Sequence, residues 1–152
     1  MSRFKFSLQQ VLELKQSLKK QLATEIIKLE LEEEKVQNRI KKLTQEWENE
    51  GRALEAEKSS LVAAEYRLRM SYLEYLSEKI EEERKALFDI ARLLATKRQK
   101  LIQFSREQKI LEKLRERREQ EFRKQERRRE QKEIDEVAAQ LTGYSKDDQS
   151  ER

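Results

Sequence analysis

Apolar residues recur in alternating steps of three and four along most of this 152-residue chain. A first series reads Leu22, Ile26, Leu29, Glu33, Val36, Ile40, Leu43, Trp47, Glu50 and Leu54. A second series reads Leu73, Leu76, Ile80, Glu83, Leu87, Ile90, Leu94, Lys97, Leu101, Phe104, Gln108 and Leu111. A period of about 3.5 residues gives a helix one narrow apolar seam, as in left-handed coiled coils. The sequence therefore predicts an all-α protein built from long, paired helices.

A break between the two series decides whether the seams face each other or another chain. The chain contains no proline, but the seam is lost after Leu54, and Ser60 is suited to cap a following helix. We predict helix one over residues 4–57, a turn over 58–62 and helix two over 62–141. The expected fold is a long antiparallel two-helix coiled-coil hairpin whose second helix is longer than the first. One unbroken helix that pairs only as a dimer is the alternative.

Composition limits what else the chain contains. Apolar residues make up 36% of the sequence and charged residues 43%, which suffices for a seam but not for a broad core. We therefore predict a single, elongated coiled-coil domain over residues 1–141. Gly143 is expected to end the second helix, and residues 142–152 are expected to form a disordered polar tail.

The second helix is predicted to outrun the first. At ~1.5 Å per residue the helices would measure about 80 and about 120 Å, so residues beyond Arg115 are predicted to lack a partner within the chain. In agreement with this expectation, Phe122 is the only apolar residue from Arg115 to Glu133. An apolar edge then returns at Ile134, Val137, Ala138 and Leu141.

Arginine dominates this overhanging segment, at Arg117, Arg118, Arg123, Arg127, Arg128 and Arg129. The segment is either a solvated charged helix or a docking helix whose arginines bind carboxylates of a partner. Nucleic acid is disfavoured as a partner, because acidic residues are interspersed and Phe122 is the only ring available for stacking. The sequence leaves the first two readings open.

The absence of histidine and cysteine restricts the chemistry of the chain. Ser-His and Cys-His nucleophile pairs are excluded, as are the usual zinc ligand sets. The two glycines stand alone, so no glycine-rich phosphate loop is present. We therefore predict a protein that acts by contact and is not an enzyme, with no metal, cofactor or small-molecule substrate.

Aromatic residues gather on both sides of the predicted turn. Tyr72 and Tyr75 each precede a seam residue by one position, so they flank the seam, and Trp47 lies on helix one at a comparable distance from the turn. These rings either thicken the coiled coil or form a binding patch, since tyrosine and tryptophan are favoured anchors at interfaces.

Three segments together resemble the FliJ family, the coiled-coil proteins of the flagellar type III export apparatus. They are "FKFSLQQVLELK", "SYLEYLSEKIEEE" and "REQKEIDEVA", in this order over about residues 4–138. The resemblance implies a hairpin similar to the central stalk of rotary ATPases, without catalytic activity of its own. The stalk proteins of injectisome secretion systems share this architecture and stay an alternative, as does a generic dimeric coiled-coil scaffold.

The resemblance also implies partners and a location. The implied partners are the flagellar export ATPase hexamer, whose assembly and activity such proteins promote, the cytoplasmic linker of the export-gate membrane protein, and export chaperones. The implied location is the cytoplasm, peripheral at the inner membrane at the base of the flagellum, and the free protein is expected to be a monomer.

Site residues follow from the same resemblance. The C-terminal motif and the arginines beside it give the candidate ATPase-binding residues Arg123, Arg127, Arg128, Arg129, Gln131, Lys132, Asp135 and Glu136. The candidate export-gate residues are Trp47, Tyr72, Tyr75 and Leu76. The chain departs from the family pattern at Gly51, where an aromatic residue is expected one turn after Trp47.

Overall fold

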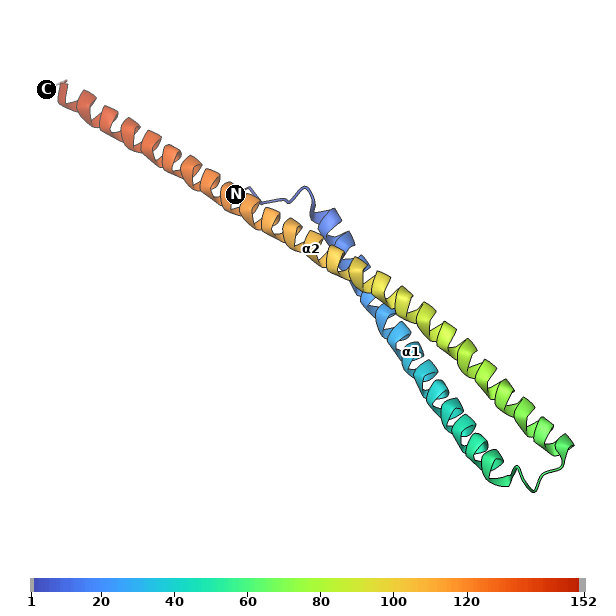
Figure 1. The fold of residues 1–152 in the computed structure, drawn as a ribbon. Helices are drawn as coiled ribbons and strands as arrows, with labels where there is room; N and C mark the ends of the chain where they lie inside the picture. The colour runs from blue at the N-terminus through green and yellow to red at the C-terminus, as the bar shows by residue number, and fades with distance from the viewer. Residues whose placement is uncertain (1, 151–152) are drawn as a thin grey trace. The chain divides into compact units, whose positions relative to one another are not determined.

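Two α-helices make up most of the computed structural model, which describes residues 2–150 (Figure 1). α1 spans Gln9–Glu57, with 49 residues, and α2 spans Ala63–Ser150, with 88 residues. The two helices pack against each other, and the described residues contain no strand. These observations confirm the predicted all-α hairpin with a longer second helix.

A short connection over residues 58–62 joins the helices, in the segment where the turn was predicted. The Ser60 amide and hydroxyl both donate to the Glu57 carbonyl oxygen, at 2.9 and 2.8 Å. The prediction that Ser60 caps the second helix was therefore wrong. α1 has no basic residue in its last turn, and Ser60 instead supplies a donor to the carbonyls that a helix end leaves free. Arg69 from α2 reaches back to the carboxylates of Glu57 and Glu50.

The outer ends of both helices differ from the prediction. α1 begins at Gln9 rather than residue 4, because the preceding residues lie extended against α2. α2 continues through Gly143 to Ser150, so the helix does not end at Gly143 as predicted. The disorder of residues 142–152 stays a prediction, and 151–152 lie outside the described residues. Gly143 has no positive φ. A single glycine costs a helix about 1 kcal/mol, too little to stop one that no proline follows.

The described chain divides into two compact units. One comprises residues 17–104 and contains the turn. The other combines residues 2–16 with residues 105–150. The single domain over residues 1–141 stays a prediction.

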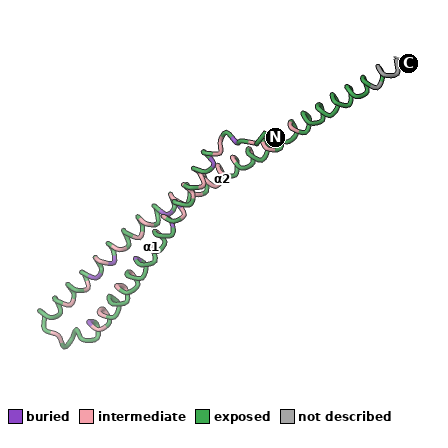
Figure 2. Tube along the Cα trace, turned by 180° about the vertical axis from the view of Figure 1, so that it is seen from behind, coloured by how far each residue is buried: buried purple, intermediate pink, exposed green. Residues whose placement is uncertain are grey.

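The predicted seams form the core of the 17–104 unit. Leu22, Ile26 and Leu94 are buried and cluster together. Packed against them are Leu29, Ile90, Leu101 and Phe104. Figure 2 shows buried and half-buried positions recurring along both helices with exposed residues between them, as a narrow seam requires.

Charged residues within the seams form ion pairs between the two helices. Arg39 bonds Glu83 at 3.2 Å, and Lys97 donates to Glu25 at 2.7 Å. The Lys97 ammonium, first by its hydrogen bond and then by its charge, holds the pKa of the Glu25 carboxyl below its usual range. Because a shift of one helix along the other would separate these pairs, they favour a single register.

Candidate functional site

An extended N-terminal segment lies against α2 in the unit formed by residues 2–16 and 105–150. We call residues 3–8 the N-terminal strap. Phe6 is buried, and the ring of Phe4 lies 5.6 Å from the ring of Phe122. Arg118 donates to the Ser7 hydroxyl at 2.9 Å, and its guanidinium stacks over Phe6 at 5.7 Å.

The strap corrects the prediction that residues beyond Arg115 lack a partner within the chain. An extended chain advances about 3.3 Å per residue, roughly twice the rise of a helix, so the strap covers more of α2 than a helix of equal length. It reaches as far as Phe122. The stretch of α2 that lacks such cover begins after this residue.

Residues 123–144 of α2 are exposed apart from the half-buried Glu126. We call residues 123–133 the arginine segment. Three of its links join neighbours on the same helix: Arg123 to Glu119 at 3.0 Å, Arg129 to Glu126 at 3.3 Å, and Gln131 to Asp135 at 3.0 Å. Exposed pairs of this kind are worth only ~0.2–0.5 kcal/mol each, so a partner can replace them at little cost.

The side chains of the other four candidate ATPase-binding residues make no hydrogen bond or ion pair within the described part of the chain. They are Arg127, Arg128, Lys132 and Glu136. All eight candidates therefore lie on exposed helix, four joined to neighbours and four not. Successive residues on a helix are about 100° apart, so the segment presents its charges around the whole axis.

An exposed apolar stripe follows the arginine segment. Its members are Ile134, Val137, Leu141 and Tyr144. They share one helix face, because they are spaced in steps of three and four. Ile134 and Val137 border a shallow hollow together with Glu130 and Glu133. The sequence analysis missed Tyr144, although its spacing from Leu141 continues the stripe.

Trp47, Tyr72 and Tyr75 form an aromatic patch in the 17–104 unit. The Tyr72 hydroxyl donates to the carboxylate of Glu46, so Tyr72 of α2 lies at the level of Glu46, the residue before Trp47 in α1. This hydrogen bond, together with burial and the negative charge, raises the pKa of Tyr72. The rings of Tyr72 and Tyr75 stack with centroids 6.3 Å apart.

The seam pattern agrees with the burial of one residue in this region and not with that of another. Leu76, predicted with the export-gate residues, is 2% exposed, so a partner cannot reach it while the helices are packed. Trp47, predicted within the seam, is 44% exposed. Lys79 was missed as a neighbour, and its ammonium lies 5.7 Å from the Tyr75 ring centroid. The spacing of Tyr72, Tyr75 and Lys79 in steps of three and four is the signal that joins them on one face.

Among residues 2–150, no helix is long and apolar enough to cross a membrane. The same residues contain no cluster of three or more acidic side chains placed to hold a metal ion.

These features define a class of protein, a two-helix hairpin whose longer helix carries an exposed, arginine-rich segment. The profile of the family described as "Flagellar FliJ protein" matches residues 4–146, and the chain belongs to this family. Members of the family are non-enzymatic components of the flagellar export apparatus. Searches of curated proteins and of solved structures gave no match.

Proposed function

We propose that the protein is a stalk that binds the hexameric flagellar export ATPase through the arginine segment and promotes assembly and activity of the ring. The observation that carries the proposal is the exposure of residues 123–144 on a continuous helix. A helix without a packed face is suited to a partner that surrounds it. Membership of the FliJ family supports the export apparatus as the place of that partner.

Charge around the helix axis suits binding within a ring. Arg127, Arg128 and Arg129 point in three directions, because each residue turns the helix by about 100°. Carboxylates in the lumen can then bind one arginine or another as the helix turns, since the guanidinium fork pairs well with carboxylates. The apolar stripe adds a contact on one face only.

Truncation after Phe122 tests the stalk proposal. The truncated chain keeps the contact between Phe4 and Phe122 but lacks the arginine segment and the apolar stripe. We expect the full chain to accelerate ATP hydrolysis by the purified export ATPase, and the truncated chain to leave the basal rate unchanged. The rate is measured over a range of stalk concentrations.

The outcome also separates the stalk from a dimeric scaffold. Equal acceleration by both chains contradicts binding through the arginine segment. No acceleration by the full chain, together with sedimentation as a stable dimer rather than an 18.5 kDa monomer, favours the generic scaffold. The exposed apolar stripe is the surface through which such a dimer would pair.

The second contact in this proposal joins the aromatic patch to the cytoplasmic linker of the export-gate protein. Trp47→Ala combined with Tyr75→Ala is expected to weaken linker binding by at least about tenfold, because exposed aromatic anchors often carry ~1–2 kcal/mol each. The affinity is measured by titration calorimetry. Phe88→Ala is the matched control, since Phe88 is an exposed ring elsewhere in the same unit, and equal weakening by it contradicts the assignment.

Two further parts of the proposal rest on the family alone. The protein handles export chaperones, and it lies in the cytoplasm at the inner membrane beneath the flagellum. The match to a flagellar family favours this system over an injectisome.

A further inference from the structure

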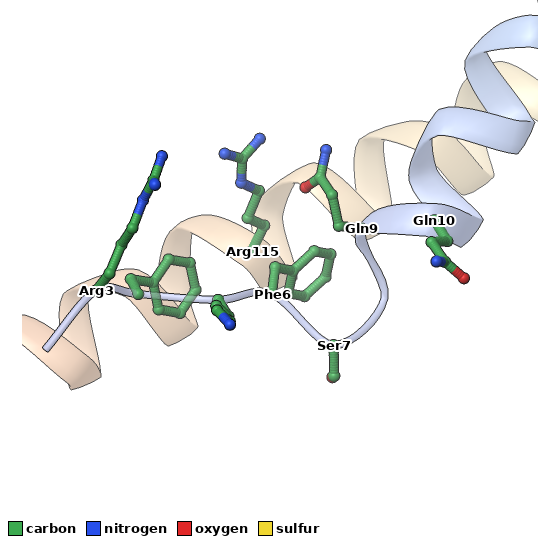
Figure 3. A pocket seen from close by; sticks show the side chains of 8 residues that line it. Arg3, Phe6, Ser7, Gln9, Gln10 and Arg115 are labelled. Carbon is green, nitrogen blue, oxygen red and sulfur yellow. The ribbon is translucent and has the colours of Figure 1, made fainter.

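A hollow beside the N-terminal strap is bordered by three cations, and none of its described lining residues is acidic. Its volume is about 590 Å³, and its lining residues are Arg3, Phe4, Lys5, Phe6, Ser7, Gln9, Gln10 and Arg115 (Figure 3). We infer that this cationic hollow binds an acidic peptide segment of a partner protein through side-chain carboxylates. The inference concerns a different surface from the arginine segment and does not depend on stimulation of an ATPase.

The extended strap explains how two of the cations come to face the hollow. In an extended chain, successive side chains point to opposite sides. Phe4 and Phe6 turn towards α2, where one contacts Phe122 and the other is buried. Arg3 and Lys5 alternate with these two rings along the strap and are exposed, and all four residues line the hollow. The same packing that anchors the strap therefore displays its two charges.

Arg115 supplies the third cation from α2. Its side chain and that of Arg3 point in the same direction beside the strap (Figure 3). α1 adds positive potential at its first turn, which contains no acidic residue, because the N-terminal end of a helix dipole is positive. The hollow thus collects positive charge from the strap, α1 and α2.

The three cations differ from Arg117 and Arg123 of α2, which are held in ion pairs. Arg117 pairs with Glu121, and Arg123 pairs with Glu119. The side chains of Arg3, Lys5 and Arg115 make no ion pair or hydrogen bond with any residue that the structure describes. A carboxylate of a partner could therefore bind these cations without displacing an acidic residue of the same chain.

The size and walls of the hollow favour a peptide over a small inorganic anion. Sites of roughly 300–1,000 Å³ hold ligands of several side chains' size. The two phenyl rings give apolar wall, which a phosphate ion cannot use but the aliphatic parts of a peptide can. Arginine forks bind carboxylates in two-point contacts, so Asp and Glu side chains are the matching groups.

Binding of a labelled peptide of alternating Asp, Glu and Leu to the full-length chain tests the inference. The probe is compared with its uncharged analogue, in which Asn and Gln replace Asp and Glu. We expect saturable fluorescence anisotropy for the acidic peptide only. Reversal of the three cations, Arg3→Glu, Lys5→Glu and Arg115→Glu, is expected to weaken binding by more than about tenfold, since hydrogen bonds between charged groups are stronger than neutral ones.

A matched control separates the hollow from general charge. The triple variant Lys41→Glu, Lys42→Glu and Arg84→Glu makes the same change in net charge on exposed residues of the other unit. We expect this variant to bind the peptide with an affinity close to that of the unmodified chain. Equal weakening by the two triples overturns the inference, because binding would then depend on net charge alone.

A second variant tests whether the strap builds the site. Phe4→Ala with Phe6→Ala keeps every cation but removes the rings that hold the strap on α2. We expect peptide binding to be lost while circular dichroism shows the hairpin still helical. If this variant binds the peptide as tightly as the unmodified chain, the strap does not form the binding site. Displacement of the peptide by inorganic phosphate but not by free glutamate overturns the choice of a carboxylate ligand.

Discussion

Exchange of Arg127, Arg128 and Arg129 for Glu is expected to abolish stimulation of the export ATPase and to leave helix content unchanged. The three side chains are exposed, and within the described part of the chain only Arg129 has an ion pair, with Glu126 at 3.3 Å. Their loss therefore removes little from folding. Glutamates at these positions would repel the carboxylates that the proposed binding requires, and like charges in close contact cost several kcal/mol. The measurements are the rate of ATP hydrolysis and the circular dichroism spectrum.

A second triple variant changes the net charge by the same amount and serves as the control. Lys41→Glu, Lys42→Glu and Arg84→Glu alters exposed positions outside the arginine segment, and it should stimulate the ATPase like the unmodified chain. If both triples lose stimulation, long-range electrostatic attraction explains the result and direct contact does not. If the arginine triple still stimulates, the arginine segment is not the binding surface.

Much of the fold follows from the sequence, because a coiled-coil seam is a local pattern. The period of the first series predicts burial of Leu22 and Ile26, and that of the second predicts burial of Leu94. Even the charged positions Glu83 and Lys97 belong to the seams, where ion pairs to the facing helix satisfy them. The local spacing of residues is enough to assign both the buried and the charged residues to the seams.

The extended conformation of the N-terminal strap could not be predicted from the local sequence. No residue from Phe4 to Gln9 breaks a helix, so the sequence predicts helix there. The extended state depends instead on Phe122 and Arg118, which lie at the other end of the chain and meet the strap only after folding. The cationic hollow is a product of the same contact, so no motif in the sequence indicates it.

The sequence predicts the exposure of one candidate surface but not that of every residue in the other. The exposure of the arginine segment follows from the missing seam, since a helix face without apolar residues gains nothing from burial. The exposure of Trp47 could not be predicted from the sequence. Periodicity tells which face of the helix a residue lies on, but not how deeply its side chain is buried. Leu76 and Tyr75 do follow the pattern, since the seam residue Leu76 is 2% exposed and the flanking Tyr75 is an exposed ring.

Leu94→Ala is expected to destabilise the 17–104 unit by about 2–5 kcal/mol, the range for removing a buried leucine from a packed core. Leu94 is 1% exposed and forms the centre of the cluster with Leu22 and Ile26. Its neighbour Leu93 is 45% exposed, so Leu93→Ala removes the same atoms and should cost less than about 1 kcal/mol. Urea unfolding followed by circular dichroism measures both. Both variants replace Leu with Ala in a helix, so their effects on helix propensity are equal. Equal losses in the free energy of unfolding would mean that the seams do not pack as a core. That result would contradict the hairpin.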